Sequence, residues 1–424
     1  MAKALTRKEE PRATDWRLTT ALFLFTGLAE SLAFGHFQAF TPLYLRELHV
    51  PAGQIPAWTG FLGMIGFVLG LPLLPLWGPL AERVGRKPII VRSAVIEAFM
   101  FVIASRAGSP YALAVARFLS GFVLGNTGVM LALQAEVSPP RRVGLAIALV
   151  SSGPSIAIAA GPLLGGVIAS DFGLRSLFLV DAGLTALSAV LLMLMLHEPP
   201  RVRSQSSTGR LALGAMRDVL QIAPVRNLFL VYLLFSLGLS AVQPFLPLWI
   251  HALQAVPAPS LLEGSAAYIV GLLLTLGGIA MAVGTPLLGW LGDRAGVRRA
   301  LLVSLLVNGV GLIGQGTVAS LAALAFWRIV QGFGQGGVSA NLMTTLARIA
   351  PPDRRASLMN LGLLPQQLAW FVGPLLGTAA TELLGLHSML LAAGVLAFLA
   401  WPLALVWLPR VPKPAELSAG NLDI

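Results

Sequence analysis

The chain has 424 residues, of which 56% are hydrophobic and only 11% are charged, and its mean hydropathy is +0.81. A soluble domain carries about 25% charged residues, so this composition excludes a soluble protein and indicates many membrane spans. The formal net charge of +11 would suit a nucleic-acid-binding protein, but its distribution, described below, assigns it to membrane topology instead.

Twelve apolar segments follow one another along the chain, each close to the 20 or so residues that cross a bilayer. They are residues 19–44, 57–80, 89–105, 110–134, 143–170, 174–196, 228–250, 266–291, 300–318, 320–347, 357–383 and 388–408. We therefore predict an all-α integral membrane protein with twelve transmembrane helices. The 45 glycines and 29 prolines predict kinked helices that pack closely.

Basic residues are unequally divided between the two sides of the predicted membrane. If the amino terminus lies inside the cell, only Arg46, Arg106 and Arg175 fall in outside loops, and most of the 29 Lys and Arg fall in inside segments. The positive-inside rule then predicts that both termini are cytoplasmic. We expect a monomer in the inner (plasma) membrane, with the lipid bilayer as its surroundings and no nucleic-acid partner.

Several kinds of site are not expected. The first apolar segment is too long for a signal peptide, and the chain has no cysteine for disulfides or thiolate metal sites. Five scattered histidines do not predict a zinc site, and no phosphate-binding Walker loop is present. We therefore expect no metal, no cofactor and no enzymatic activity.

Four sequence blocks occur twice, in the same order and about half a chain apart. The first copies begin at Gln38, Gly78, Arg117 and Gly161, and the second copies begin at Gln243, Gly289, Arg328 and Gly373. Internal repeats in a hydrophobic chain are typical of secondary transporters. They predict two six-helix halves, 1–196 and 227–409, a cytoplasmic linker, 197–226, and a cytoplasmic tail, 410–424. Residues 210–221 predict an amphipathic helix, on the membrane surface or packed under the bundle.

Three of these blocks resemble motifs of one family. The block from Gly78 to Pro88 (GPLAERVGRKP) resembles the loop between helices 2 and 3 of the major facilitator superfamily. Arg117, with Gly121 and Gly125, resembles its helix 4 motif. The segment 161–166 (GPLLGG) resembles the helix 5 motif of its proton-coupled drug antiporters, although alanine replaces two glycines of that pattern, at 148 and 157. The resemblance implies two pseudo-symmetric halves that give alternating access to a central site.

The resemblance also implies a set of gating residues. In the family, the loop acid meets the start of helix 11 and stabilises the outward-open state, which assigns that role to Glu82, a glutamate where aspartate is usual. Arg86 would pair with Glu136 at the end of helix 4. The remaining gating residues are Gly78, Arg83 and Gly85, the second copies Asp293 and Arg294, and the helix 5 and helix 11 residues Gly161, Pro162, Gly373 and Pro374. Alternatively, the loop charges only mark an inside loop.

Charged residues within predicted spans are usually functional or paired, because burying a charge in the bilayer costs free energy. Glu30 and Arg117 lie at similar depth, on the two helices that line the first half's cavity in this family. We predict that Glu30 is the protonatable carboxylate and that Arg117 modulates it or binds substrate; alternatively, the two form a permanent ion pair. Asp181 is either a second proton site or an interhelical hydrogen-bonding group. For Glu97 we favour a structural role. His36 is either a solvated residue at the outer rim or a participant in proton transfer.

Polar and aromatic residues predict the substrate site and its outer gate. Gln38 and Gln243 occupy equivalent repeat positions near the outer helix ends and suggest an extracellular gate, although Pro42 and Pro247 nearby allow the alternative of helix-kink support. In the second half, the residues expected to face the cavity are Phe245, Trp249, Arg328, Gln331 and Gln335.

These features together predict a proton-coupled exporter of small amphipathic or lipophilic compounds, whose partners are that substrate and protons. One alternative is a facilitator for uptake or for sugar or metabolite export. A more remote alternative is a membrane sensor built on the same fold.

Overall fold

The computed structural model describes residues 15–199, 221–254, 264–351, 358–359 and 361–408. Every element assigned in this part of the chain is a helix, which confirms the predicted all-α fold. The predicted amphipathic helix at 210–221 falls almost entirely outside the described residues, as does the tail.

The first half of the chain contains six membrane-crossing units. In order, its helices are α1 (Trp16–Glu47), η1 (Ala52–Gln54), α2 (Ile55–Leu73), η2 (Leu74–Leu76), α3 (Trp77–Val84), α4 (Arg86–Ser105), α5 (Pro110–Leu119), η3 (Ser120–Phe122), α6 (Asn126–Val137), α7 (Val143–Phe172) and α8 (Leu174–Met195). The fourth predicted span is interrupted between η3 and α6, because Gly125 has a left-handed φ of 96°. A side chain there would also meet the Trp77 ring.

The second half repeats this order with fewer interruptions. Its helices are α10 (Ala223–Val242), η4 (Gln243–Phe245), α11 (Leu246–Gln254), α12 (Ala266–Ala295), α13 (Val297–Thr317), α14 (Leu321–Ile349), α16 (Leu364–Phe398) and α17 (Ala400–Trp407). The last two predicted spans form one run of helix, which bends at Gly385, where φ is 80°.

Ten of the described helical segments are long and apolar enough to cross a membrane. The run of α16 and α17 counts as one segment although it holds two predicted spans. The 29-residue α14 is not among the ten. Its polar residues, among them Arg328, Gln331 and Gln335, lower its hydropathy, which is consistent with a helix that turns a polar face away from lipid.

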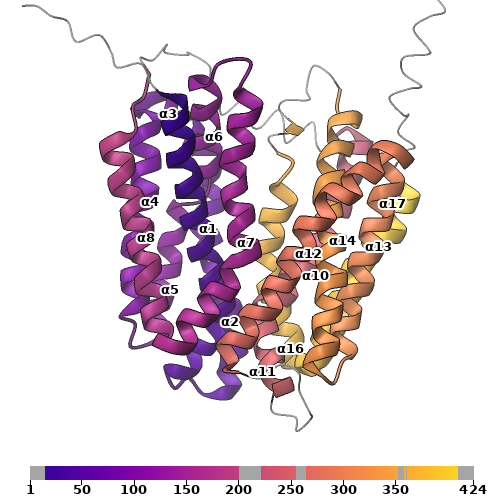
Figure 1. Ribbon diagram of the computed structural model, residues 1–424. Coiled ribbons are helices and arrows are strands. Elements are labelled where there is room, and N and C mark those ends of the chain that lie inside the picture. The colour runs from indigo at the N-terminus through magenta and orange to yellow at the C-terminus, as the bar shows by residue number, and fades with distance from the viewer. Residues whose placement is uncertain (1–14, 200–220, 255–263, 352–357, 360, 409–424) are drawn as a thin grey trace, which may run out of the picture.

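The two halves lie side by side (Figure 1), and two symmetric helix pairs join them. In one pair, α7 packs against α12, and the Thr275 hydroxyl accepts a hydrogen bond of 3.0 Å from the Leu163 amide. In the other pair, α2 packs against α16, and the Thr378 hydroxyl donates to the Pro56 carbonyl at 3.2 Å. Glycine allows the close approach in both pairs, since a Cβ on Gly271 would overlap the Pro162 carbonyl oxygen.

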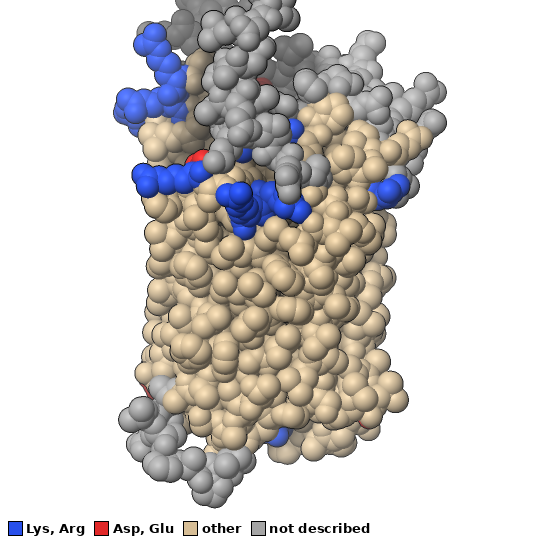
Figure 2. Space-filling view, turned by 90° about the vertical axis from the view of Figure 1, so that its right-hand side faces the viewer, with Lys and Arg blue, Asp and Glu red and all other residues tan. Residues whose placement is uncertain are grey.

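One end of the bundle carries most of the basic residues, and we call it the basic end. Figure 2 shows Lys and Arg gathered near one end of the visible face, above a broad band almost free of charge. The helix ends at this end hold Arg83, Arg86 and Lys87 in the first half and Arg294 in the second half. Such a distribution, with basic residues beside a band almost free of charge, is typical of a membrane protein.

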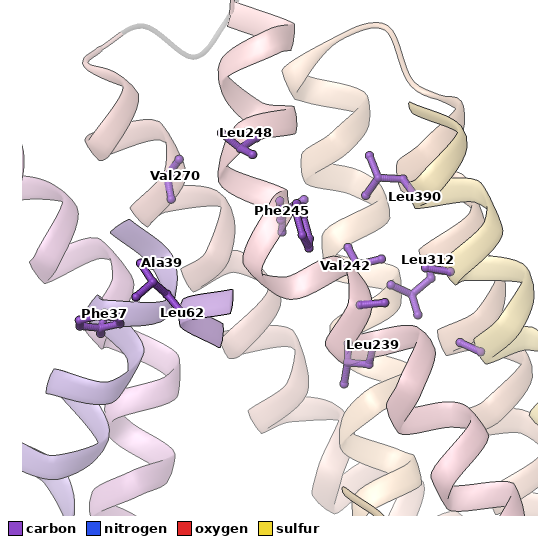
Figure 3. Packing of buried hydrophobic residues seen from close by; sticks show 14 of the residues in the cluster. Phe37, Ala39, Leu62, Leu239, Val242, Phe245, Leu248, Val270, Leu312 and Leu390 are labelled. Atoms are coloured by element: carbon purple, nitrogen blue, oxygen red, sulfur yellow. The ribbon is translucent and has the colours of Figure 1, made fainter. Parts of the chain in front are cut away.

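The hydrophobic core indicates where the two halves meet. One cluster contains residues of both halves, and Figure 3 shows Phe37, Ala39 and Leu62 of the first half near residues such as Phe245 of the second. These residues lie towards the end opposite the basic end. The cluster at the basic end draws only on the first half. The halves therefore close against each other at the opposite end and diverge at the basic end (Figure 1).

Candidate functional site

Glu30 lies on α1 and accepts a hydrogen bond from an amide rather than from an arginine. Asn126, the first residue of α6, donates its side-chain N–H to Oε1 of Glu30 at 2.5 Å. Among the described residues, no ion pair joins Glu30 to Arg117. The structure therefore does not support the alternative of a permanent ion pair, because similar depth in the membrane does not fix which helix face a side chain lies on; the proton-coupling role of Glu30 and Arg117 stays a prediction.

Arg117 is 1% exposed and has aromatic and backbone neighbours. Its Nε donates to the Leu62 carbonyl at 3.2 Å, and its guanidinium lies 4.7 Å from the Phe34 ring centre and 5.2 Å from that of Phe37. Its Nη1 is buried with no hydrogen-bond partner in the described structure. The carboxylate near enough to act on its charge is Glu97.

Glu97 lies on α4 and is 4% exposed. Its electrostatic neighbours are Glu30, Asp181 and Arg117, and its Oε2 has no hydrogen-bond partner among the described residues. The sequence favoured a structural role, and the structure adds that Glu97 has three charged side chains of the same half, Glu30, Asp181 and Arg117, as electrostatic neighbours. Its position inside a predicted span was the sequence signal that identified it as unusual.

Asp181 of α8 and His36 of α1 form a buried pair. His36 Nδ1 lies 2.8 Å from Oδ1 of Asp181, and Nε2 lies 2.9 Å from the Gly161 carbonyl oxygen. Because a carbonyl only accepts, Nε2 carries a proton, and the short contact to Asp181 then requires one more. The pair therefore holds one proton between the imidazole and the carboxylate. His36 is buried rather than a rim residue.

Gly161 and Pro162 lie between this pair and the second half. The Gly161 carbonyl accepts from His36, and the Pro162 carbonyl oxygen faces Gly271 of α12. The equivalent second-half residues lie at the other junction between the halves, where Pro374 contacts Gly63. Within the second half, a side chain on Gly373 would overlap the Ser240 hydroxyl. A gating role for these residues stays a prediction, but each motif does lie where the halves meet.

The two glutamines of the predicted outer gate, Gln38 and Gln243, do not contact each other through a hydrogen bond in the described structure. Gln38 has a buried Nε2 without a partner there. Phe245 is fully buried in the packing between α10, α11 and α16. Trp249 is half-buried and donates its indole N–H to the Gln315 carbonyl of α13 at 3.1 Å; that its ring faces the substrate cavity stays a prediction.

Three polar residues on one helix of the second half are joined to one another. Arg328 donates from Nη1 to Oε1 of Gln331 at 3.0 Å, and Gln331 donates from Nε2 to Oε1 of Gln335 at 2.8 Å. Arg328 is 5% exposed and Gln331 is fully buried. That these three residues face the substrate cavity stays a prediction.

At the basic end, Arg86 forms the predicted ion pair with Glu136. Glu82 is exposed, and its predicted partners at the start of helix 11 (355–357) lie outside the described residues. Gly85 has a φ of 111° and makes the turn between α3 and α4. In the second copy, Arg348 lies 3.9 Å from Asp293, and Arg294 lies over the Trp290 ring at 4.2 Å.

Sequence reasoning missed Glu198, which follows the sixth span. Its carboxylate accepts hydrogen bonds from the backbone amides of Arg86 at 2.9 Å and Lys87 at 3.2 Å, and so caps the amino terminus of α4. Lys87 in turn donates to the Met193 carbonyl at 2.8 Å. Arg298 repeats this contact in the second half by donating to carbonyls at the end of α17. Only the alignment of the two repeats marks Lys87 and Arg298 as equivalent.

Comparisons with known proteins agree with this geometry. The family model of the Major Facilitator Superfamily matches residues 22–270 and 228–423. The multidrug resistance protein MdtG of Salmonella dublin is 26% identical over 388 residues, which are 91% of this chain and 94% of the relative. MdtG of Yersinia enterocolitica is 25% identical over 412 residues, covering 96% and 97%.

Solved structures show the same fold at lower sequence identity. A bacterial homolog of the human lysosomal transporter Spinster, in an inward-facing and unoccupied conformation, superposes with a TM-score of 0.73 at 16% identity, covering 94% of this chain and 98% of that one. The nucleoside transporter NupG superposes with a TM-score of 0.70 at 15% identity, covering 91% and 98%. This chain therefore belongs to the major facilitator superfamily, and it is a multi-pass membrane transporter rather than an enzyme.

Proposed function

We propose that the chain is a proton-coupled exporter of small amphipathic or lipophilic compounds in a bacterial inner membrane. Its basic end faces the cytoplasm, as the positive-inside rule requires, so the halves are open inwards in this conformation. The name of its MdtG relatives, multidrug resistance protein, supports export of such compounds.

The observation that carries the proposal is the state of the buried carboxylates in the first half. Glu30 is bound by the neutral Asn126 amide, and Oδ2 of Asp181 and Oε2 of Glu97 have no partner in the described structure. Carboxylates neutralised by permanent ion pairs would not exchange protons, whereas in the described part of the chain these three groups have only Arg117 and His36 as cationic partners. They are therefore able to bind and release protons as the carrier changes conformation.

The transport cycle follows from alternating access between the halves. Protonation of Glu30 from the outside favours release of the substrate there, and proton release inside resets the carrier. The Gly161–Pro162 and Gly373–Pro374 segments would form the outer closure in the state described here. Glu82 would stabilise the opposite, outward-open state through the start of helix 11.

The test is transport into inverted membrane vesicles under an imposed proton gradient. Acidifying the lumen should drive accumulation of lipophilic dyes if the chain exchanges substrate for protons. A facilitator for sugars or metabolites would equilibrate its substrate whatever the gradient, and a sensor would move nothing. Vesicles that lack the protein supply the baseline for passive dye uptake.

A further inference from the structure

Arg328 is a buried cation without a buried anion beside it. No acidic side chain lies within ion-pair distance of it in the described part of the chain. Its Nη1 is engaged by Gln331, but its Nε is buried and has no partner there. Leaving a charge uncompensated in the membrane is costly, so such a residue calls for a ligand or partner.

The free edge of the guanidinium faces a glycine. A Cβ built on Gly277 of α12 would lie 2.8 Å from Nη2 and 3.2 Å from Nε of Arg328. The absence of a side chain at Gly277 therefore lets the guanidinium pack directly against the backbone of α12. The terminal N–H groups of a guanidinium match the two oxygens of a carboxylate, sulfonate or phosphate group.

The equivalent residue of the first half has different surroundings. Arg117 occupies the same repeat position as Arg328, but it has Glu97 as an electrostatic neighbour and two phenylalanine rings at its guanidinium. In the first half, the positive charge of Arg117 is therefore offset by side chains of the same half. The positive charge of Arg328 has no such counterpart among the described residues, so its equivalence to Arg117 in the repeat does not explain why it is there.

Arg328 begins a polar row on α14. Gln331, Gln335 and Ser339 follow at spacings of three, four and four residues and so share one helix face. Gln331 is buried, Gln335 is half-buried and Ser339, nearer the basic end, is exposed. The most exposed large side chain of this helix, Phe326 at 58%, lies on the roughly opposite, lipid-facing side. The row therefore runs from Arg328 along the inner face of the half towards the open end.

We propose that Arg328, oriented by Gln331 and Gln335, binds the anionic group of an amphipathic substrate, which makes anionic or zwitterionic amphiphiles the preferred class. This assignment rests on the proposed transport of amphipathic compounds. The apolar part of the ligand would lie towards the space between the halves, and its anionic group would approach the guanidinium along the polar row of α14 rather than on the side packed against Gly277.

The test compares binding of two fluorescent probes with one aromatic skeleton. 1-Anilinonaphthalene-8-sulfonate carries a sulfonate, and N-phenyl-1-naphthylamine lacks it. Both are titrated into the full-length protein in lipid nanodiscs, with empty nanodiscs subtracted. Arg328→Gln should weaken binding of the sulfonate by about tenfold or more, as expected for a hydrogen-bonded charge, and should change binding of the neutral probe by less than about twofold.

Two further variants separate charge from folding. Arg328→Lys keeps the charge and should retain part of the sulfonate affinity, and Arg299→Gln removes an exposed charge of the same half and should bind both probes as the wild type does. The proposal is overturned if the wild type does not bind the sulfonate, or if Arg328→Gln weakens both probes equally or neither. No gradient is imposed, so failure of proton-driven export in vesicles would be a separate result.

Discussion

Gly271 offers a direct way to shift the balance between the two states of the carrier. It lies on α12, where a Cβ would overlap the Pro162 carbonyl oxygen on α7 and approach Gly166 at 3.1 Å. The overlapping atoms belong to backbone and are unable to rotate away. Gly271→Ala should therefore push the halves apart at the end opposite the basic end and favour the outward-open state.

The size of the shift follows from the cost of overpacking. Inserting a methyl group into a close contact costs about 1–3 kcal/mol, which corresponds to a population change of roughly 5–150-fold. Spin labels on cysteines introduced at Gln54 and Glu382, exposed positions at the opposite end in different halves, would report the distance between the halves. The native chain has no cysteine to interfere.

The expected result is a new or enlarged population at longer distance in Gly271→Ala. Gly183→Ala is the matched control, because a Cβ there would meet nothing within 4 Å, and its distances should equal those of the wild type. Identical distance distributions in Gly271→Ala and the wild type would refute the inference that this contact holds the outer end closed.

Three further predictions concern other contacts. Glu82→Ala should move the population towards the inward-open state, since a helix-dipole contact contributes about 0.3–1 kcal/mol; unchanged labelling of cysteines at the basic end would contradict the latch. Glu198→Ala should lower the free energy of unfolding by about 0.5–2 kcal/mol, as for other lost helix caps, and thermal unfolding that equals the wild type would contradict the cap. Asp181→Ala should destabilise the protein by about 1–3 kcal/mol because it leaves Nδ1 of the buried His36 without its partner. Asp181→Asn should unfold closer to the wild type, and equal losses in both variants would contradict the pairing.

The spans and their order were predictable because the lengths of the apolar segments and the spacing of the repeats can be counted directly in the sequence. Two features of these spans were not predictable. The break at Gly125 depends on the close approach of Trp77, and its repeat equivalent Gly336 lies inside an unbroken helix. The same motif residue therefore has two backbone conformations, which tertiary packing decides.

The members of the candidate site were easier to identify than their partners. Glu30, Arg117 and Asp181 stand out in sequence as charges inside apolar spans. Their contacts depend on helix rotation, which a depth estimate does not give, so the amide of Asn126 and the electrostatic role of Glu97 were missed. Glu198 was missed because it follows the last span of its half and meets α4 only in the folded chain.

The central claim is that Glu30 couples transport to protons, and Glu30→Gln tests it most directly. In inverted vesicles with the membrane potential clamped and the lumen one pH unit more acidic, one exchanged proton supports about tenfold accumulation of a neutral dye. The wild type should reach this ratio, while Glu30→Gln should equilibrate the dye without accumulating it and still exchange it at equal pH. Gradient-driven accumulation by Glu30→Gln equal to that of the wild type would contradict the account and place the coupling proton elsewhere.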